Sequence, residues 1–164
     1  MAATTHIDKL GEDFVLRPFR PTDRGALELM YRDFDPKRVA QGLPPAGEEQ
    51  RVRWLNSVLR SGHHLIVELH GVVRGHGMLL PFREGEAELA NFLHQSARDR
   101  GIGTALNRAL VELARQLGLR RVWLSVEPFN RRAIRSYEKV GFQRRPMSPW
   151  APEIEMELFL EGQS

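Results

Sequence analysis

The segment Arg98–Leu106 reads Arg-Asp-Arg-Gly-Ile-Gly-Thr-Ala-Leu and lies between a short apolar run and a long amphipathic pattern. The apolar run, residues 89–93, is typical of a strand, and the pattern that follows has the spacing of a helix. Two glycines therefore stand where a helix begins. Free N–H groups at a helix start bind anions, and glycine lets a ligand approach the backbone closely. The segment predicts a phosphate or pyrophosphate site over residues 98–106.

Two common phosphate-binding loops do not fit this segment. A Walker A loop requires Lys and then Ser or Thr after its last glycine, whereas Thr and Ala follow Gly103. A dinucleotide-binding fingerprint requires a third glycine where the chain has Leu106. The pattern that fits is Arg-x-x-Gly-x-Gly, filled by Arg98, Gly101 and Gly103. It resembles the pyrophosphate loop of the GNAT family of acyl-CoA-dependent N-acyltransferases.

Length and composition are those of an ordinary globular protein. The chain has 164 residues, 41% hydrophobic and 27% charged. We expect one domain over residues 1–164, with a core over about residues 14–160. No apolar run approaches the roughly eighteen residues of a membrane span, and residues 1–8 lack the apolar core of a signal peptide. The absence of cysteine excludes disulfides and thiolate metal sites and fits a cytoplasmic protein.

The formal net charge is +3, and arginine supplies most of the basic residues in the second half of the chain. A basic patch can bind nucleic acid or surround a ligand that carries several phosphates. The chain has no aromatic-rich RNA motif and no metal finger, so no nucleic-acid partner is expected. No spacing of His, Asp and Glu predicts a metal site.

Apolar spacing predicts an alternation of strands and helices. Strands are expected over residues 14–16, 64–69, 72–80, 86–93, 121–126, from 142, and over 154–160. Helices are expected over residues 26–34, 52–59, 102–117 and 131–140. Short turns between residues 64 and 93 predict an antiparallel meander, and the strand–helix–strand over residues 86–126 predicts a parallel pair. Residues 1–12 are expected to be loose, and residues 36–47 to form a loop.

Two further segments resemble the GNAT family. Asn130–Phe142 matches its Asn … Ala … Tyr … Gly-Phe segment, one helix and one strand after the loop. Arg17, Pro18 and Asp23 match the Arg-Pro … Asp opening of many GNAT domains. The order of elements is similar over Phe14–Leu160. The resemblance implies an α/β (α+β) GNAT fold: a mixed, mostly antiparallel sheet with a central pair of splayed parallel strands and flanking helices.

The same resemblance implies acetyl-CoA as cosubstrate, held between the strands that end near Leu93 and Val126. The pantetheine arm would bond the exposed edge of the first strand, where a backbone N–H would also polarise the acyl carbonyl. The implied cofactor-binding residues are Leu93, His94, Gln95, Arg98, Asp99, Arg100, Gly101, Ile102, Gly103, Thr104 and Asn130. A helix cap explains Asn130 equally well.

The implied reaction is direct attack of a neutral amine on the thioester, which needs a base for the amine and a proton for the leaving thiolate. Tyr137 is the expected proton donor; the alternative is a core residue. Glu88 lies on the strand where some GNAT enzymes carry a catalytic glutamate; the alternative is a solvated carboxylate. Histidines that could serve as the base instead, although single histidines are more often structural, are His64, His76 and His94.

The expected partner is an amine acceptor, either a small molecule or a protein amine. It would enter between residues 26–60 and the loop Pro146–Pro152, where Trp150 is either a wall of the site or a surface aromatic. Asp99 replaces a glycine frequent in the family, and an acid there must point away from the pyrophosphate or pair with an arginine. The alternative function is a catalytically weak GNAT-like acyl-CoA sensor. Many relatives are dimers, so the resemblance allows a homodimer.

Overall fold

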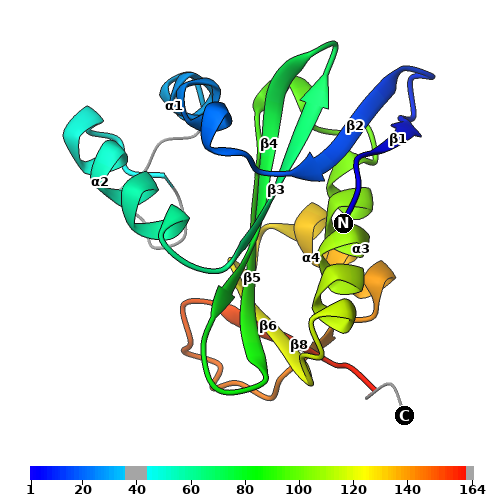
Figure 1. Ribbon diagram of the computed structural model, residues 1–164. Coiled ribbons are helices and arrows are strands. Elements are labelled where there is room, and N and C mark those ends of the chain that lie inside the picture. Colours follow the sequence, from blue (N-terminus) through cyan, green and yellow to red (C-terminus); the bar gives the residue numbers. More distant parts are fainter. Residues whose placement is uncertain (36–43, 162–164) are drawn as a thin grey trace.

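The computed structural model describes residues 1–35 and 44–161, and within them one mixed sheet carries helices on both faces (Figure 1). The strands run in the order β1-β2-β3-β4-β5-β6-β8-β7. Their bounds are β1 Thr4–Ile7, β2 Asp13–Pro18, β3 His63–Leu69, β4 Val72–Pro81, β5 Glu86–Leu93, β6 Arg121–Val126, β7 Gln143–Arg144 and β8 Ile154–Phe159. The helices are α1 Arg24–Arg32, α2 Glu48–Leu59, α3 Ile102–Gln116 and α4 Arg131–Val140, with short turns η1 Pro21–Asp23 and η2 Gln95–Ala97.

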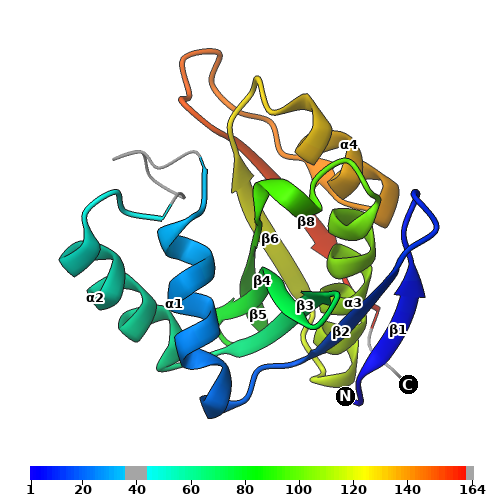
Figure 2. The same cartoon turned by 90° about the horizontal axis from the view of Figure 1, so that it is seen from above.

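Each face of the sheet has its own apolar core. One core packs the sheet against α3 and α4, and the other packs it against α1 and α2 (Figure 2). The predicted apolar stripe of α3 lies in the first core, where Leu106 and Leu110 are fully buried. Gly77 of β4 allows this packing, because a Cβ there would meet Leu106 Cδ1 at 2.8 Å and Leu110 Cδ1 at 2.9 Å.

The predicted parallel pair is confirmed, and its two strands part early. The parallel register runs only from Glu86 opposite Arg121 to Glu88 opposite Trp123. Both strands continue, β5 along β4 to Leu93 and β6 along β8 to Val126. The mostly antiparallel sheet with a splayed central pair is therefore as predicted.

The prediction that residues 1–12 are loose is wrong, because Thr4–Ile7 pairs with β2 as an edge strand. The turn between β1 and β2 is stabilised by the Asp8 carboxylate, which accepts the N–H groups of Leu10 at 2.8 Å and Glu12 at 2.9 Å. Gly11 closes the turn with a φ of 81°. Elsewhere α2 begins four residues before the expected Val52, and most of the predicted loop over residues 36–47 lies outside the described residues.

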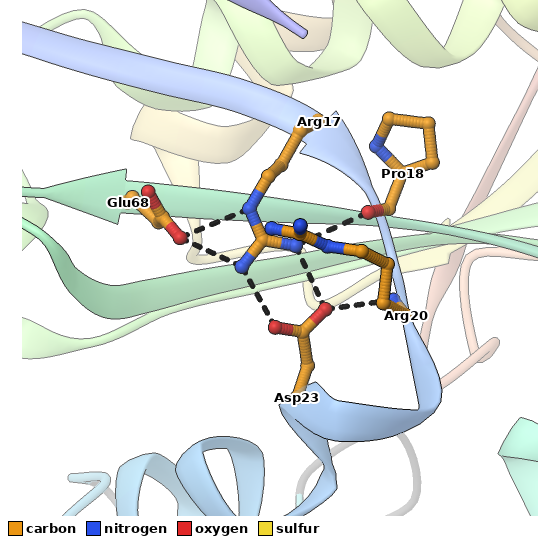
Figure 3. Close-up of polar contacts among 5 residues, drawn as sticks. All are labelled: Arg17, Pro18, Arg20, Asp23 and Glu68. Atoms are coloured by element: carbon orange, nitrogen blue, oxygen red, sulfur yellow. Dashed lines mark hydrogen bonds and ion pairs between the residues drawn. The ribbon is translucent and has the colours of Figure 1, made fainter. Parts of the chain in front are cut away.

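The Arg-Pro … Asp segment forms a buried ion cluster that joins β2, η1 and β3 (Figure 3). Both guanidinium Nη atoms of Arg17 donate to the Asp23 carboxylate at 2.7 Å, and its Nε and Nη2 donate to Glu68 at 2.9 and 2.7 Å. Asp23 also accepts the Arg20 N–H at 2.7 Å. Arg17 and Asp23 are each 7% exposed, so the cluster fixes where α1 leaves the sheet with little competition from water.

Replacing Asp23 with Asn should destabilise the protein in a pH-dependent way. The hydrogen bonds from Arg17 hold the pKa of the Asp23 carboxyl below its usual value of 3.8. A lowered pKa stabilises the fold above the unfolded-state pKa, and this contribution is lost as pH falls through the folded-state pKa. Asp23→Asn should therefore lower the free energy of unfolding at pH 7 by about 3 kcal/mol, measured by urea denaturation. The difference from wild type should shrink below about pH 4.

The matched control is Asp13→Asn, which removes the same charge from an exposed position at the start of β2. It should change the free energy of unfolding by less than about 0.5 kcal/mol. Equal effects of the two substitutions would contradict a stabilising role for the Arg17–Asp23 cluster.

Candidate active site

The parting of β5 and β6 leaves one edge of β5 unpaired toward the gap. The His94 N–H donates to the Arg74 carbonyl at 2.8 Å, which continues the antiparallel ladder with β4. Because backbone groups in such a ladder alternate in direction, those of Asn91 and Leu93 point the other way, into the gap. Over residues 1–35 and 44–161, no strand pairs with the backbone groups that face this gap.

The start of α3 lies beside the end of β5. Gly101 caps the helix with a φ of 81°, and the first helical hydrogen bond runs from the Ala105 N–H to the Gly101 carbonyl at 3.3 Å. Within the described residues, the N–H groups of Ile102, Gly103 and Thr104 have no protein acceptor. A Cβ on Gly103 would lie 3.3 Å from a methyl group of Leu93, so the helix start and the strand end nearly touch. Free amides at a helix start are an arrangement that can bind an anion, and these three lie at the mouth of the gap.

The Arg98 side chain points to protein groups. Its Nε donates to the Leu93 carbonyl at 3.0 Å, and its Nη2 donates to the Asp35 carbonyl. The guanidinium lies over the Phe34 ring, 5.1 Å from the centroid. Arg98 thus ties the loop to the end of β5 and to the segment after α1.

The next two side chains of the loop are bound to other elements. Asp99 adopts a φ of 62° and pairs with Arg132 of α4, Oδ1 to Nη1, at 3.0 Å. The arginine partner that Asp99 was expected to need is therefore present. Arg100 Nη1 contacts Asp8 Oδ2 at 3.1 Å and Glu12 Oε2 at 3.0 Å, both in the β1–β2 turn. Side chains 98–100 therefore bind the loop to the end of β5, to α4 and to the β1–β2 turn.

Tyr137 lies in the core on the α3–α4 face and is 8% exposed. Burial raises the pKa of its phenol to about 12, although a hydrogen bond with the Asn91 side chain opposes the shift. Asn91 also donates to Asn107, whose amide donates to Ser136 Oγ at 3.1 Å, and Ser136 contacts Thr104 Oγ1 at 2.9 Å. This polar chain joins the phenol, the edge of β5 and the first turn of α3. Sequence reasoning missed Asn91, because its partners Asn107 and Tyr137 lie on two other elements, α3 and α4.

Glu88 lies on the opposite face of the sheet and is half-buried. Burial, and to a lesser extent the charge of Glu153, raises the pKa of its carboxyl above 4.5. The Glu153 charge indicates that the end of the proline-rich loop lies close to Glu88. Glu86, two residues earlier on the same face, is ion-paired with Arg120 at 3.3 Å and Arg121 at 3.6 Å. Of these two carboxylates, only Glu88 lies where the strands begin to part.

A sequence model described as the Acetyltransferase (GNAT) family matches residues 27–142. The chain belongs to the GNAT acetyltransferase family. A curated relative, the uncharacterized N-acetyltransferase YjgM of Escherichia coli, is 30% identical over 87 residues. That match covers 50% of this chain and 52% of the relative, so it spans about half the length of each.

Solved structures of other GNAT proteins share the fold. The GNAT domain of S. lividans PAT superposes with a TM-score of 0.79 at 19% identity, covering 96% of this chain and 97% of that one. The yncA acetyltransferase of Salmonella typhimurium, solved with acetyl-CoA, superposes with a TM-score of 0.75 at 20% identity, covering 92% of this chain and 96% of that one. A ribosomal-protein-alanine N-acetyltransferase from Brucella melitensis superposes with a TM-score of 0.71 at 23% identity, covering 88% of this chain and 99% of that one.

The three histidines weighed as bases are engaged in protein contacts in this GNAT chain. His94 is 4% exposed, and its Nε2 contacts the Asp33 carboxylate at 2.7 Å. The backbone N–H of His94 donates to the Arg74 carbonyl in the sheet. His76 is fully buried between Tyr31 at 2.6 Å and His64 at 2.9 Å, and burial lowers its pKa to about 3. These contacts favour the structural alternative for all three.

Other predicted site residues are exposed at the surface. Asn130 caps α4 by accepting the Ala133 N–H at 3.3 Å, and its side chain is exposed. The Gln95 amide donates to the Asp33 carbonyl at 2.7 Å. Trp150 is 90% exposed. Across the described ranges, 1–35 and 44–161, no His, Cys, Asp and Glu group could hold a metal and no helix could span a membrane.

Proposed function

We propose that this protein is an N-acetyltransferase that transfers the acetyl group of acetyl-CoA to a primary amine by direct attack. The observation that carries the proposal is the parting of β5 and β6 directly beside the free helix start at Ile102–Thr104. Family membership supports the acyl transfer, and the acetyl-CoA in the yncA structure supports the cosubstrate. We treat residues 1–164 as a single catalytic domain.

In this proposal the thioester of acetyl-CoA lies in the gap between β5 and β6. The amides of Ile102, Gly103 and Thr104 hold the pyrophosphate, with the positive end of α3 behind them. The pantetheine arm extends along the free edge of β5 and bonds the backbone of Leu93 and Asn91. A backbone N–H of that edge polarises the thioester carbonyl, which lowers the cost of negative charge on its oxygen.

Two side chains on opposite faces then complete the proton transfers. The amine nitrogen forms a bond to the carbonyl carbon, and the carbon–sulfur bond breaks. Glu88, directly or through water, accepts the proton that the amine loses, and its raised pKa makes it a stronger base than an exposed carboxylate. Tyr137 donates its proton to the thiolate, and Asn91 holds the phenol at the edge of the gap.

The acceptor reaches Glu88 from the side of α1, α2 and the loop Pro146–Pro152. Charge from Glu153 at Glu88 supports this route. A hollow of about 430 Å³ opens on the same face, lined by Phe82, Arg83, Glu86, Arg121, Trp123, Arg145, Glu155, Glu157 and Phe159. Small amines and protein amines both remain acceptor classes, and the protein acts as a monomer or a homodimer.

A panel of amines tests the proposal against an acyl-CoA sensor. Thiol release from acetyl-CoA should rise above a blank without acceptor for at least one amine class, and mass spectrometry should find the acetylated amine. Acetyl-CoA binding without acceptor-dependent thiol release, across small amines and peptides, would favour the sensor.

Substituting Gly103 should abolish CoA binding and leave the fold intact. Its φ is not positive, and an added Cβ would meet only the flexible end of Leu93, so the backbone tolerates a side chain. Gly103→Glu places bulk and negative charge on the anion site, so calorimetry should detect no CoA binding while circular dichroism is unchanged. Gly25→Glu is the control, because Gly25 stands in the first turn of α1 with nothing within 4 Å. Wild-type affinity of Gly103→Glu would remove the anion site from the account.

Removing the Tyr137 hydroxyl should slow chemistry. Tyr137→Phe deletes one O–H and almost no volume, so the free energy of unfolding should fall by about 1 kcal/mol or less. The turnover number should fall roughly 10²-fold with acetyl-CoA affinity little changed. With a pKa near 12 the phenol stays protonated, so the loss should be constant between about pH 7 and 10.

Tyr31→Phe controls for loss of a buried hydroxyl, because Tyr31 bonds His76 on the other face. It should leave turnover within about threefold of wild type if no group at the gap is affected. Wild-type turnover in Tyr137→Phe, measured where chemistry limits the rate, would show that Tyr137 is a core residue alone.

A pH profile should identify Glu88 as the base. If only the amine must lose a proton, log kcat/KM rises with pH at a slope of about one on the acid side. If the Glu88 carboxylate is also required, the slope becomes about two at pH values below the Glu88 pKa. Glu88→Gln should keep the slope near one throughout and lower kcat/KM roughly 10²-fold. Glu86→Gln, on the same face, should retain the steeper limb. A steeper limb that survives in Glu88→Gln would assign the base elsewhere.

A further inference from the structure

The β1–β2 turn, residues 8–12, packs directly on the pyrophosphate loop (Figure 2). The Lys9 N–H donates to the Arg100 carbonyl at 2.9 Å, and the Arg100 guanidinium bridges Asp8 and Glu12. His70, in the β3–β4 turn, contacts the same Glu12 carboxylate at 2.8 Å. The turn is therefore held to the loop by one backbone and two side-chain contacts.

This arrangement lays the Lys9 side chain against the cap of α3. A Cβ built on Gly101 would lie 3.3 Å from Lys9 Cε and 3.4 Å from Lys9 Cγ. The Lys9 side chain is exposed, and among the described residues its ammonium makes no ion pair. By contrast Arg98, Arg100 and Arg132 around the same loop are all bonded to protein groups.

We propose that Lys9 binds a phosphate group of CoA, and that the Arg100 bridge to Asp8 and Glu12 positions it. The inference rests on the proposed function and adds a contact from outside the family match, which begins at residue 27. Arg100 binds both acids, and neither carboxylate forms an ion pair with Lys9 in the described part of the chain, so the Lys9 ammonium is left to contact an anion at the helix start. An ammonium on a flexible stem can follow either the pyrophosphate or the 3′-phosphate.

Calorimetric titration of the full-length chain with CoA tests the proposal. Lys9→Met should weaken CoA binding about five- to tenfold at low salt, and Lys9→Arg should restore most of the affinity. The loss should shrink as salt rises, because the contact is screened. Arg115→Met is the matched control: it removes the same charge from the last turn of α3, about 20 Å from the helix start, and should leave affinity unchanged. Thermal unfolding of each variant confirms that the turn still folds.

Titration with 3′-dephospho-CoA identifies the phosphate. A Lys9→Met loss that persists supports contact with the pyrophosphate, and a loss that disappears supports contact with the 3′-phosphate. If folded Lys9→Met binds CoA within twofold of wild type, the inference about Lys9 is wrong. Loss of CoA binding in Gly103→Glu would still support the CoA site itself. Wild-type protein that does not bind CoA overturns the proposed function and this inference together.

Discussion

The parting of β5 and β6 is the constraint on which the proposed site depends. Each strand is paired along its full length on its other side, β5 with β4 and β6 with β8, so neither can move across to close the gap. The backbone groups of Asn91 and Leu93 are left facing an opening within a sheet. The Leu93 carbonyl already accepts a hydrogen bond from Arg98, and the other groups of this edge are open to hydrogen bonds from an extended ligand with amide groups. In the proposed function, the pantetheine arm supplies these hydrogen bonds.

In the loop over residues 98–104, the side chains and the backbone have different roles. Side chains 98–100 reach the end of β5, α4 and the β1–β2 turn, whereas the N–H groups of Ile102–Thr104 have no acceptor in the described part of the chain. This gives a structural reason for the arginine in Arg-x-x-Gly-x-Gly: Arg98 joins the loop before α3 to the end of β5, and in the proposed function the anion is bound by the amides. It also explains why Asp99 is tolerated, because Asp adopts a φ of 62° more readily than most residues and its charge is paired with Arg132.

Periodicity and glycine placement predicted most of the fold, because these signals are local. The α3 stripe, the short turns between residues 64 and 93 and the parallel crossover all follow from residues close in sequence. The β1 strand was missed, since Thr4–Ile7 is polar and is held through Arg100, 92 residues away from Asp8. The same reason applies to the candidate site: Tyr137 and Glu88 could be proposed from the family resemblance and their places on a helix and a strand, but Asn91 and Lys9 acquire their surroundings only when distant elements meet.

Amide hydrogen exchange with and without acetyl-CoA tests the central claim most directly. The account predicts slower exchange at Ile102, Gly103 and Thr104, and along the free edge of β5 at Asn91 and Leu93, with little change in β2 and β3. Protection confined to other surfaces, such as the hollow around Trp123, would contradict it, as would binding that leaves the helix start and the β5 edge unprotected.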